Sequence, residues 1–92
     1  MALLNDTEIK QALPKLSGWK QSGNAIERNF EFADFKAAMA FVNKVADVAE
    51  KANHHPDIDI RYNKVKLSLV SHDAGGVTDR DVRMAERINQ AV

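Results

Sequence analysis

The sequence contains no cysteine, and this absence excludes several kinds of chemistry before any motif is considered. Without a thiol the chain cannot form a disulfide, bind zinc through thiolates or use a cysteine nucleophile. It also has no excess of charge of either sign, because 13 Lys and Arg residues balance 13 Asp and Glu residues. The charge balance therefore indicates neither nucleic acid nor an anionic membrane as a partner.

Long hydrophobic runs are absent as well. The apolar stretches extend over only a few residues, and polar residues follow the N-terminus closely from Asn5 onward. A membrane span needs about 20 apolar residues and a signal peptide needs an apolar segment of about 7–15, so we expect neither. We therefore expect a cytoplasmic protein. Its length and its 45% hydrophobic content indicate one globular domain over residues 1–92.

The first third of the chain predicts a short helix followed by a hairpin. A polar cap at residues 5–6 can begin the helix, and Pro14 ends it. Gly23-Asn24 then suits a two-residue type II′ turn between strands at residues 19–22 and 25–32. Alternating side chains give this hairpin one apolar face and one polar face.

The most regular feature is a predicted long helix from its cap, Asp34, to about Ala52. Its apolar positions cover about 180° of the helix circumference, whereas packing on one sheet needs a stripe of about 100°. The excess predicts a second buried contact, with another subunit, and therefore a homo-oligomer. The residues expected on the inner stripe are Phe35, Met39, Val42, Ala46 and Ala49.

Alternating apolar residues predict a second hairpin, with strands at residues 58–62 and 65–69 and a turn at Asn63-Lys64. Thr78 and Asp81 then resemble the capping box of a last helix. The element order is αββαββα, which predicts an α+β fold: a four-stranded antiparallel sheet with helices packed on one face. The residues of the last helix expected to face inward are Val82, Ala85, Ile88 and Val92.

All three histidines, His54, His55 and His72, fall at the ends of predicted elements. If the second hairpin turns at Asn63-Lys64, its register continues outward to place His55 opposite His72. We therefore predict that the three imidazoles surround one concavity. Because imidazole titrates near neutral pH, such a group can both donate and accept protons.

Two other interpretations of the histidines stay open. Each can be an ordinary solvated surface residue, and together with Asp57 or Asp73 they can offer nitrogen and oxygen ligands to a metal. The neighbours His54 and His55 point in different directions, however, so only one of them joins a metal site easily. Acid and base chemistry without a metal is therefore the preferred hypothesis.

Two carboxylates are candidates for orienting these imidazoles. Glu50 lies four residues before His54 and can hydrogen-bond it from the last helical turn, and an ordinary solvated Glu is the equal alternative. The default interpretation of Asp81 is an acid in the first turn of a helix, where its negative charge interacts favourably with the helix dipole. The more specific alternative is that Asp81 orients a histidine.

Taken together, these residues follow a recognisable spacing, which resembles the signature of the pterin-4a-carbinolamine dehydratases. Further short matches extend the likeness over nearly the whole chain. The residues that carry the signature are Glu50, His54-His55-Pro56, Tyr62, His72 and Asp81, and the further matches include Gly18-Trp19, Asp34-Phe35 and Gly76-Val77-Thr78.

The resemblance implies dehydration of 4a-hydroxytetrahydrobiopterin to the quinonoid dihydropterin, a step in tetrahydrobiopterin recycling. It implies no cofactor and no metal, because proton transfer at the hydroxyl and at N5 suffices. By the family's pattern His54 and His72 are the general acid and base, and the third catalytic residue, His55, mainly holds the substrate. The implied substrate-binding residues are Asn53, His54, His55, Val70, Ser71, His72 and Asp73, with Glu50 and Asp81 orienting the imidazoles.

The resemblance also implies partners. Family members form homodimers and homotetramers, and the pterin is recycled for an aromatic amino-acid hydroxylase. In animals one member doubles as a dimerisation cofactor for a homeodomain transcription factor. The alternative function is therefore a non-catalytic interaction protein, an assembly or transcription cofactor on the same fold. The presence of all three histidines favours the enzyme, because a scaffold does not need them.

Overall fold

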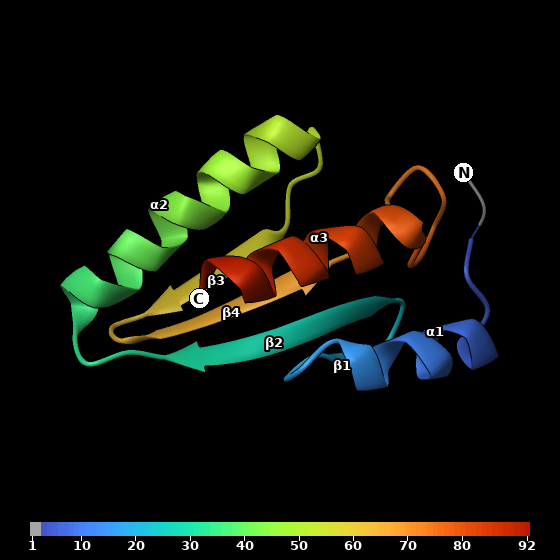
Figure 1. The fold of residues 1–92 in the computed structure, drawn as a ribbon, viewed down its shortest axis with the longest axis horizontal. Helices are drawn as coiled ribbons and strands as arrows, with labels where there is room; N and C mark the ends of the chain where they lie inside the picture. The colour runs from blue at the N-terminus through green and yellow to red at the C-terminus, as the bar shows by residue number, and fades with distance from the viewer. Residues whose placement is uncertain (1–2) are drawn as a thin grey trace.

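The strands form one antiparallel sheet whose apolar face is covered by helices. The computed structural model describes residues 3–92. The sheet has the strand order β1-β2-β4-β3, and Figure 1 shows α2 and α3 above the same face. This arrangement confirms the predicted α+β fold. The elements are α1 (Asp6–Ala12), a 3-10 turn (Leu13–Lys15), β1 (Lys20–Ser22), β2 (Ala25–Glu31), α2 (Phe35–Ala52), β3 (Asp57–Arg61), β4 (Lys64–Leu69) and α3 (Asp79–Ala91).

The first two α-helices begin where their polar caps predict. The Asn5 side chain accepts a hydrogen bond from the Glu8 backbone, and the Glu8 side chain accepts one from the Asn5 backbone. The Asp34 side chain likewise accepts from the Ala37 backbone at the start of α2. At the other end Asn53 stops α2 in the left-handed region, with φ of 50°. Each side-chain cap satisfies a backbone donor that would otherwise lack a partner, which is worth about 1 kcal/mol.

The first hairpin has the predicted register. Lys20 pairs with Glu27 across β1 and β2, and the Lys20 ammonium lies 3.7 Å from the Glu27 carboxylate. Gly23 has φ of 58°, which the first central position of a type II′ turn requires and which glycine adopts without steric cost.

The second hairpin turns one residue earlier than predicted, which shifts the pairing of β3 with β4 by two residues. Arg61 pairs with Lys64, so the turn is Tyr62-Asn63. The reason lies at Phe32, directly after β2: the Asn63 side-chain amide donates to the Phe32 carbonyl at 2.9 Å, and the Phe32 amide donates to the Asn63 carbonyl at 2.9 Å. These two bonds hold Asn63 within the turn and leave Tyr62 with φ of 54°, an unfavourable conformation for a bulky residue.

This shift removes the predicted cross-strand pairing of His55 with His72. The ladder between β3 and β4 ends at Asp57 and Ser68, before either histidine. Because side chains alternate with a period of two, a shift of two residues still leaves every strand residue on its predicted face.

Helix α2 turns a different part of its apolar arc to the sheet than predicted. Phe41 packs against Phe30 and Phe32, with ring centroids 4.6 Å and 5.0 Å apart, and this aromatic cluster fixes the rotation of the helix. As a result Phe35 is 48% exposed and Ala46 is exposed, so both were wrongly placed on the inner stripe. The buried residues of α2 are Ala38, Phe41, Val45 and Ala49, whereas Met39 and Val42 are half-buried.

Helix α3 begins with the predicted capping box of Thr78 and Asp81. Its inner face differs at the far end, because Val92 is exposed and Met84, which was not predicted, is buried. None of the helices within residues 3–92 is both long enough and apolar enough to cross a bilayer. The buried residues of α3 are Asp81, Met84, Ala85 and Ile88.

The C-terminal half of α3 is tied to the first hairpin by Asn89. Its side-chain carbonyl accepts from the Trp19 indole at 2.8 Å and from the Arg28 guanidinium at 2.6 Å. Arg28 also lies over the Phe30 ring at 4.4 Å, so its charge is stabilised on the helix-covered side of the sheet. Gly18 leaves the space for this arginine, since a Cβ there would lie 2.4 Å from the Arg28 Nε.

Candidate active site

The three histidines line one hollow beyond the ends of α2 and β4. Its volume is about 340 Å³, near the lower end of the range for small-molecule sites. The hollow therefore brings together the two segments that the sequence predicts to bind substrate. Its lining residues are Asn53, His54, His55, Val70, Ser71, His72 and Asp73.

Two abrupt changes of chain direction create this hollow. After α2 the left-handed Asn53 turns the chain away from the helix axis, and the following Pro56 forces His55 into an extended conformation. After β4 the Ser71 amide donates to the Gly76 carbonyl at 2.9 Å, which closes a compact loop. The loop after α2 and the loop after β4 then face each other.

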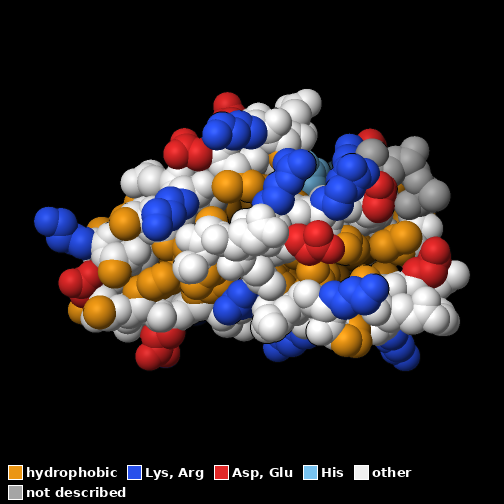
Figure 2. Space-filling view, viewed as in Figure 1, with side chains coloured by type: hydrophobic (Ala, Val, Ile, Leu, Met, Phe, Trp, Pro, Cys, Tyr) orange, Lys and Arg blue, Asp and Glu red, His pale blue; other side chains and the backbone are white. Residues whose placement is uncertain are grey.

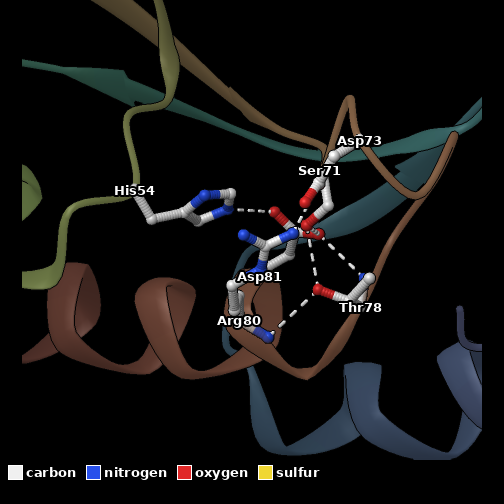
Figure 3. A network of polar contacts seen from close by, with 6 residues as sticks. All are labelled: His54, Ser71, Asp73, Thr78, Arg80 and Asp81. Carbon is white, nitrogen blue, oxygen red and sulfur yellow. Dashed lines mark hydrogen bonds and ion pairs between the residues drawn. The ribbon is translucent and has the colours of Figure 1, made fainter. Parts of the chain in front are cut away.

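Figure 3 shows His54 pointing at the buried carboxylate of Asp81. The His54 Nε2 lies 2.5 Å from Asp81 Oδ1, and only 11% of the His54 side chain is exposed. The other carboxylate oxygen, Oδ2, accepts from the Ser71 hydroxyl at 2.9 Å and from the Thr78 amide at 2.8 Å. Asp81 thus holds the imidazole, caps α3 and anchors the loop after β4.

This contact determines which nitrogen of His54 is available for chemistry. A carboxylate accepts hydrogen bonds, so Nε2 carries the hydrogen of this contact, and in the neutral imidazole Nδ1 then keeps the lone pair. The predicted contact between Asp81 and a histidine is therefore present, and it is made with His54.

Glu50 contacts a different histidine from the one predicted. Its carboxylate accepts from the His55 Nε2 at 2.5 Å, whereas the expected partner was His54. The left-handed turn at Asn53 separates His54 from the last turn of α2 and directs it towards α3, where Asp81 lies. Both side chains of the Glu50–His55 pair are more than half exposed, so this ion pair adds little to stability.

The remaining side of the hollow carries His72 and Asp73, both exposed. Asp73 accepts from the Arg80 guanidinium at 2.6 Å, and this bond holds the pKa of Asp73 below its usual value of 3.8. Arg80 was not selected by sequence reasoning. The only signal for it was its position directly before Asp81 in the first turn of a helix.

The arrangement can transfer protons to and from a bound ligand. One oriented imidazole, His54, and two more accessible ones, His55 and His72, border a hollow open to solvent. Within residues 3–92 no group of three or more His, Asp or Glu side chains is placed to hold a metal ion.

Comparison with known sequences gives a consistent match. A family model described as pterin 4 alpha carbinolamine dehydratase matches residues 2–91. A relative from Koribacter versatilis (strain Ellin345), named provisionally as a pterin-4-alpha-carbinolamine dehydratase, is 60% identical over 87 residues, which cover 95% of this chain and 93% of the relative. A relative with the same name from Sulfurisphaera tokodaii is 50% identical over 90 residues, covering 98% of this chain and 97% of the relative.

Two solved structures share the fold. A crystal structure described as a transcriptional coactivator/pterin dehydratase from Brucella melitensis has a TM-score of 0.93 at 38% identity and covers 98% of each chain. A pterin dehydratase-like protein identified as a RuBisCO assembly factor in the alpha-carboxysome has a TM-score of 0.68 at 19% identity, covering 80% of this chain and 88% of its own. At that identity the second likeness shows the fold alone.

Proposed function

The chain belongs to the pterin-4a-carbinolamine dehydratase family, and on that premise we propose that it dehydrates 4a-hydroxytetrahydrobiopterin to the quinonoid dihydropterin in tetrahydrobiopterin recycling. Family and relatives support a dehydratase-type function. The observation that carries the histidine mechanism is the single hollow lined by His54, His55 and His72, with His54 oriented by the buried Asp81.

The reaction needs two proton transfers and no change of oxidation state. The C4a–O bond breaks as the leaving hydroxyl takes up a proton, and N5 loses its proton while its electrons form the new double bond to C4a. In this proposal the lone pair on His54 Nδ1 accepts the N5 proton, and Asp81 stabilises the imidazolium that forms. His72 protonates the departing hydroxyl, and His55 mainly holds the pterin ring. His54 and His72 exchange roles when the pterin presents its other face.

Stopped-flow ultraviolet absorbance of freshly generated 4a-hydroxytetrahydropterin tests this proposal. We expect the protein to accelerate dehydration and the double variant His54→Ala plus His72→Ala to lose about 10²–10⁴-fold of that acceleration. Arg61→Ala, on β3 and outside the hollow, is the control and keeps the wild-type rate. No acceleration by the wild type, or full acceleration by the double variant, would refute the catalytic assignment.

We further propose that the protein works as a homodimer or homotetramer. Phe35 on α2 and the β3 residues Ile58 and Ile60 are exposed although they are large and apolar. β3 is an edge strand, which offers unpaired backbone groups to another chain. Light scattering that gives a monomer at micromolar concentration contradicts this proposal.

The cellular setting proposed for the reaction is the cytoplasm, beside an aromatic amino-acid hydroxylase that supplies the carbinolamine. A coupled assay tests this link: the protein raises the steady-state rate of a purified hydroxylase when the tetrahydropterin is present in catalytic amounts. An unchanged hydroxylation rate in the presence of active protein rejects the hydroxylase link.

A non-catalytic interaction role is the second candidate. It is favoured by the description of one structure of the same fold, at 38% identity, as a transcriptional coactivator/pterin dehydratase. The stopped-flow measurement separates the two functions, because a folded wild-type chain that does not accelerate dehydration supports the interaction role.

A further inference from the structure

A second hollow borders His54 on the α3 side, and arginines dominate its lining. Its volume is about 230 Å³. The three arginines are spaced three and four residues apart along α3, so they project from one face of the helix. Figure 2 shows a histidine on this face of the molecule with basic side chains on both sides of it. The lining residues of this arginine groove are Ala52, His54, Arg80, Arg83, Met84 and Arg87.

The arginine groove carries positive charge although the chain as a whole is neutral. Arg80 pairs with Asp73 and Arg83 pairs with Asp79, whereas Arg87 makes no ion pair with any part of the chain from residue 3 onward. Both acidic partners are exposed, so solvent screens these pairs and a ligand anion can compete for the two guanidinium groups.

Arg80 also carries a donor that lacks an acceptor. Its Nε is buried and makes no hydrogen bond to any of the described residues. Buried donors are nearly always paired in folded proteins, so Arg80 would gain an acceptor if its side chain shifted to meet an anion in the groove. The apolar side chains of Ala52 and Met84 in the same lining strengthen any electrostatic contact that forms there.

We propose that the arginine groove binds a phosphate-type anion, as inorganic phosphate or as a phosphate ester on a ligand whose ring occupies the histidine hollow. His54 lines both hollows, so the two sites are neighbours. The guanidinium fork matches two phosphate oxygens at once. A volume of about 230 Å³ is several times the ~30 Å³ that one water molecule occupies in the liquid, so the groove has room for a phosphate group.

The anion site itself does not depend on the dehydratase assignment, and only the ligand-borne source of the phosphate rests on it. Titration of ¹⁵N-labelled protein with inorganic phosphate, at constant ionic strength and with chloride as the competing anion, detects the site directly by NMR. We expect saturable shifts of the backbone amides from Arg80 to Arg87. Arg87→Gln should weaken phosphate binding about five- to tenfold, the discounted value of one exposed charged hydrogen bond. The matched control Arg61→Gln on β3 should leave it unchanged.

Binding of two pterins that differ only in a phosphate monoester on the side chain then distinguishes a ligand-borne phosphate from free inorganic phosphate. Tighter binding of the phosphorylated pterin, lost in Arg87→Gln, supports the site and assigns a ligand-borne phosphate. Equal binding of both pterins, together with saturable binding of inorganic phosphate, supports the site and assigns free phosphate. No saturable shift and no preference between the pterins overturns the proposal, as does a response that Arg87→Gln leaves unchanged. None of these readouts requires turnover, so they stand even if the dehydration assay fails.

Discussion

Replacing Asp81 with Asn should disable the imidazole of His54 while leaving the fold in place. Asp81 Oδ2 accepts from the Thr78 amide, a donor that cannot reverse its role. The Asn oxygen must therefore stay on that side, and its NH2 group faces His54 Nε2. Two donors cannot share one hydrogen bond, so His54 moves its hydrogen to Nδ1. Nδ1, which accepts the N5 proton in the proposed mechanism, then carries a hydrogen.

The size of the expected effect differs between activity and stability. Proton transfer by a positioned side chain contributes about 10²–10⁴-fold to rate, and the wrong tautomer forfeits most of that factor. The variant keeps the cap on Thr78, so its loss of stability is limited to weakened hydrogen bonds, about 1–3 kcal/mol. A small domain with ~5–15 kcal/mol of stability remains folded after such a loss.

Stopped-flow dehydration kinetics and urea unfolding measure the two effects on the same preparations. The matched control is Asp79→Asn, which removes the neighbouring acid of the first turn of α3 without touching a histidine. We expect Asp79→Asn to keep the wild-type rate. The reasoning fails if Asp81→Asn dehydrates the pterin within threefold of the wild type, or if its rate falls only in proportion to the unfolded fraction.

Three further predictions concern stability and assembly. Because Arg80 lowers the pKa of Asp73 in the folded chain, the pair stabilises the fold above pH 3.8, and this stabilisation is lost as the pH falls through the lower pKa of the folded state. Urea unfolding from pH 6 to pH 2 should therefore show that the Asp73→Asn variant loses less stability on acidification than the wild type does. Gly18→Ala should cost about 1–3 kcal/mol, because φ is 86° and the new Cβ would displace Arg28; a change within 0.5 kcal/mol in thermal or urea unfolding contradicts this. Phe35→Lys should shift the protein towards monomer in light scattering with little change in unfolding of the subunit, and an unchanged oligomer removes this surface from the proposed interface.

Local signals were sufficient for the order of the elements and for the residues at which the three α-helices begin. The caps at Asn5, Asp34 and Thr78 each depend on a side chain and a backbone amide at most three residues away, so the sequence alone predicts them. The order of strands and helices followed from these boundaries and from the two hydrophobic periods.

Non-local contacts decided what the sequence did not. The turn of the second hairpin is set by hydrogen bonds between Asn63 and Phe32, far away in sequence, against the poor fit of Tyr62 to a left-handed position. The rotation of α2 depends on which aromatic side chains meet Phe41 across the core. A helix with apolar residues over half its circumference does not itself indicate which part faces the sheet.

The candidate site shows the same division. The two segments that line the hollow were predicted, whereas the partner of Glu50 was not, because the left-handed turn at Asn53 reorients both histidines after it. The sequence did not identify Arg80 and the other arginines of the groove as site residues, because each alone resembles an ordinary solvated side chain on a helix.

The double hydrogen bond at Asn89 gives positions outside the hollow an influence on it. Asp81 and Asn89 lie eight residues apart on one rigid helix, about 12 Å along its axis, and each end is fixed by side chains from other elements. A screen of random variants for lost turnover should therefore recover substitutions at Asn89 and Trp19, although neither residue meets the ligand.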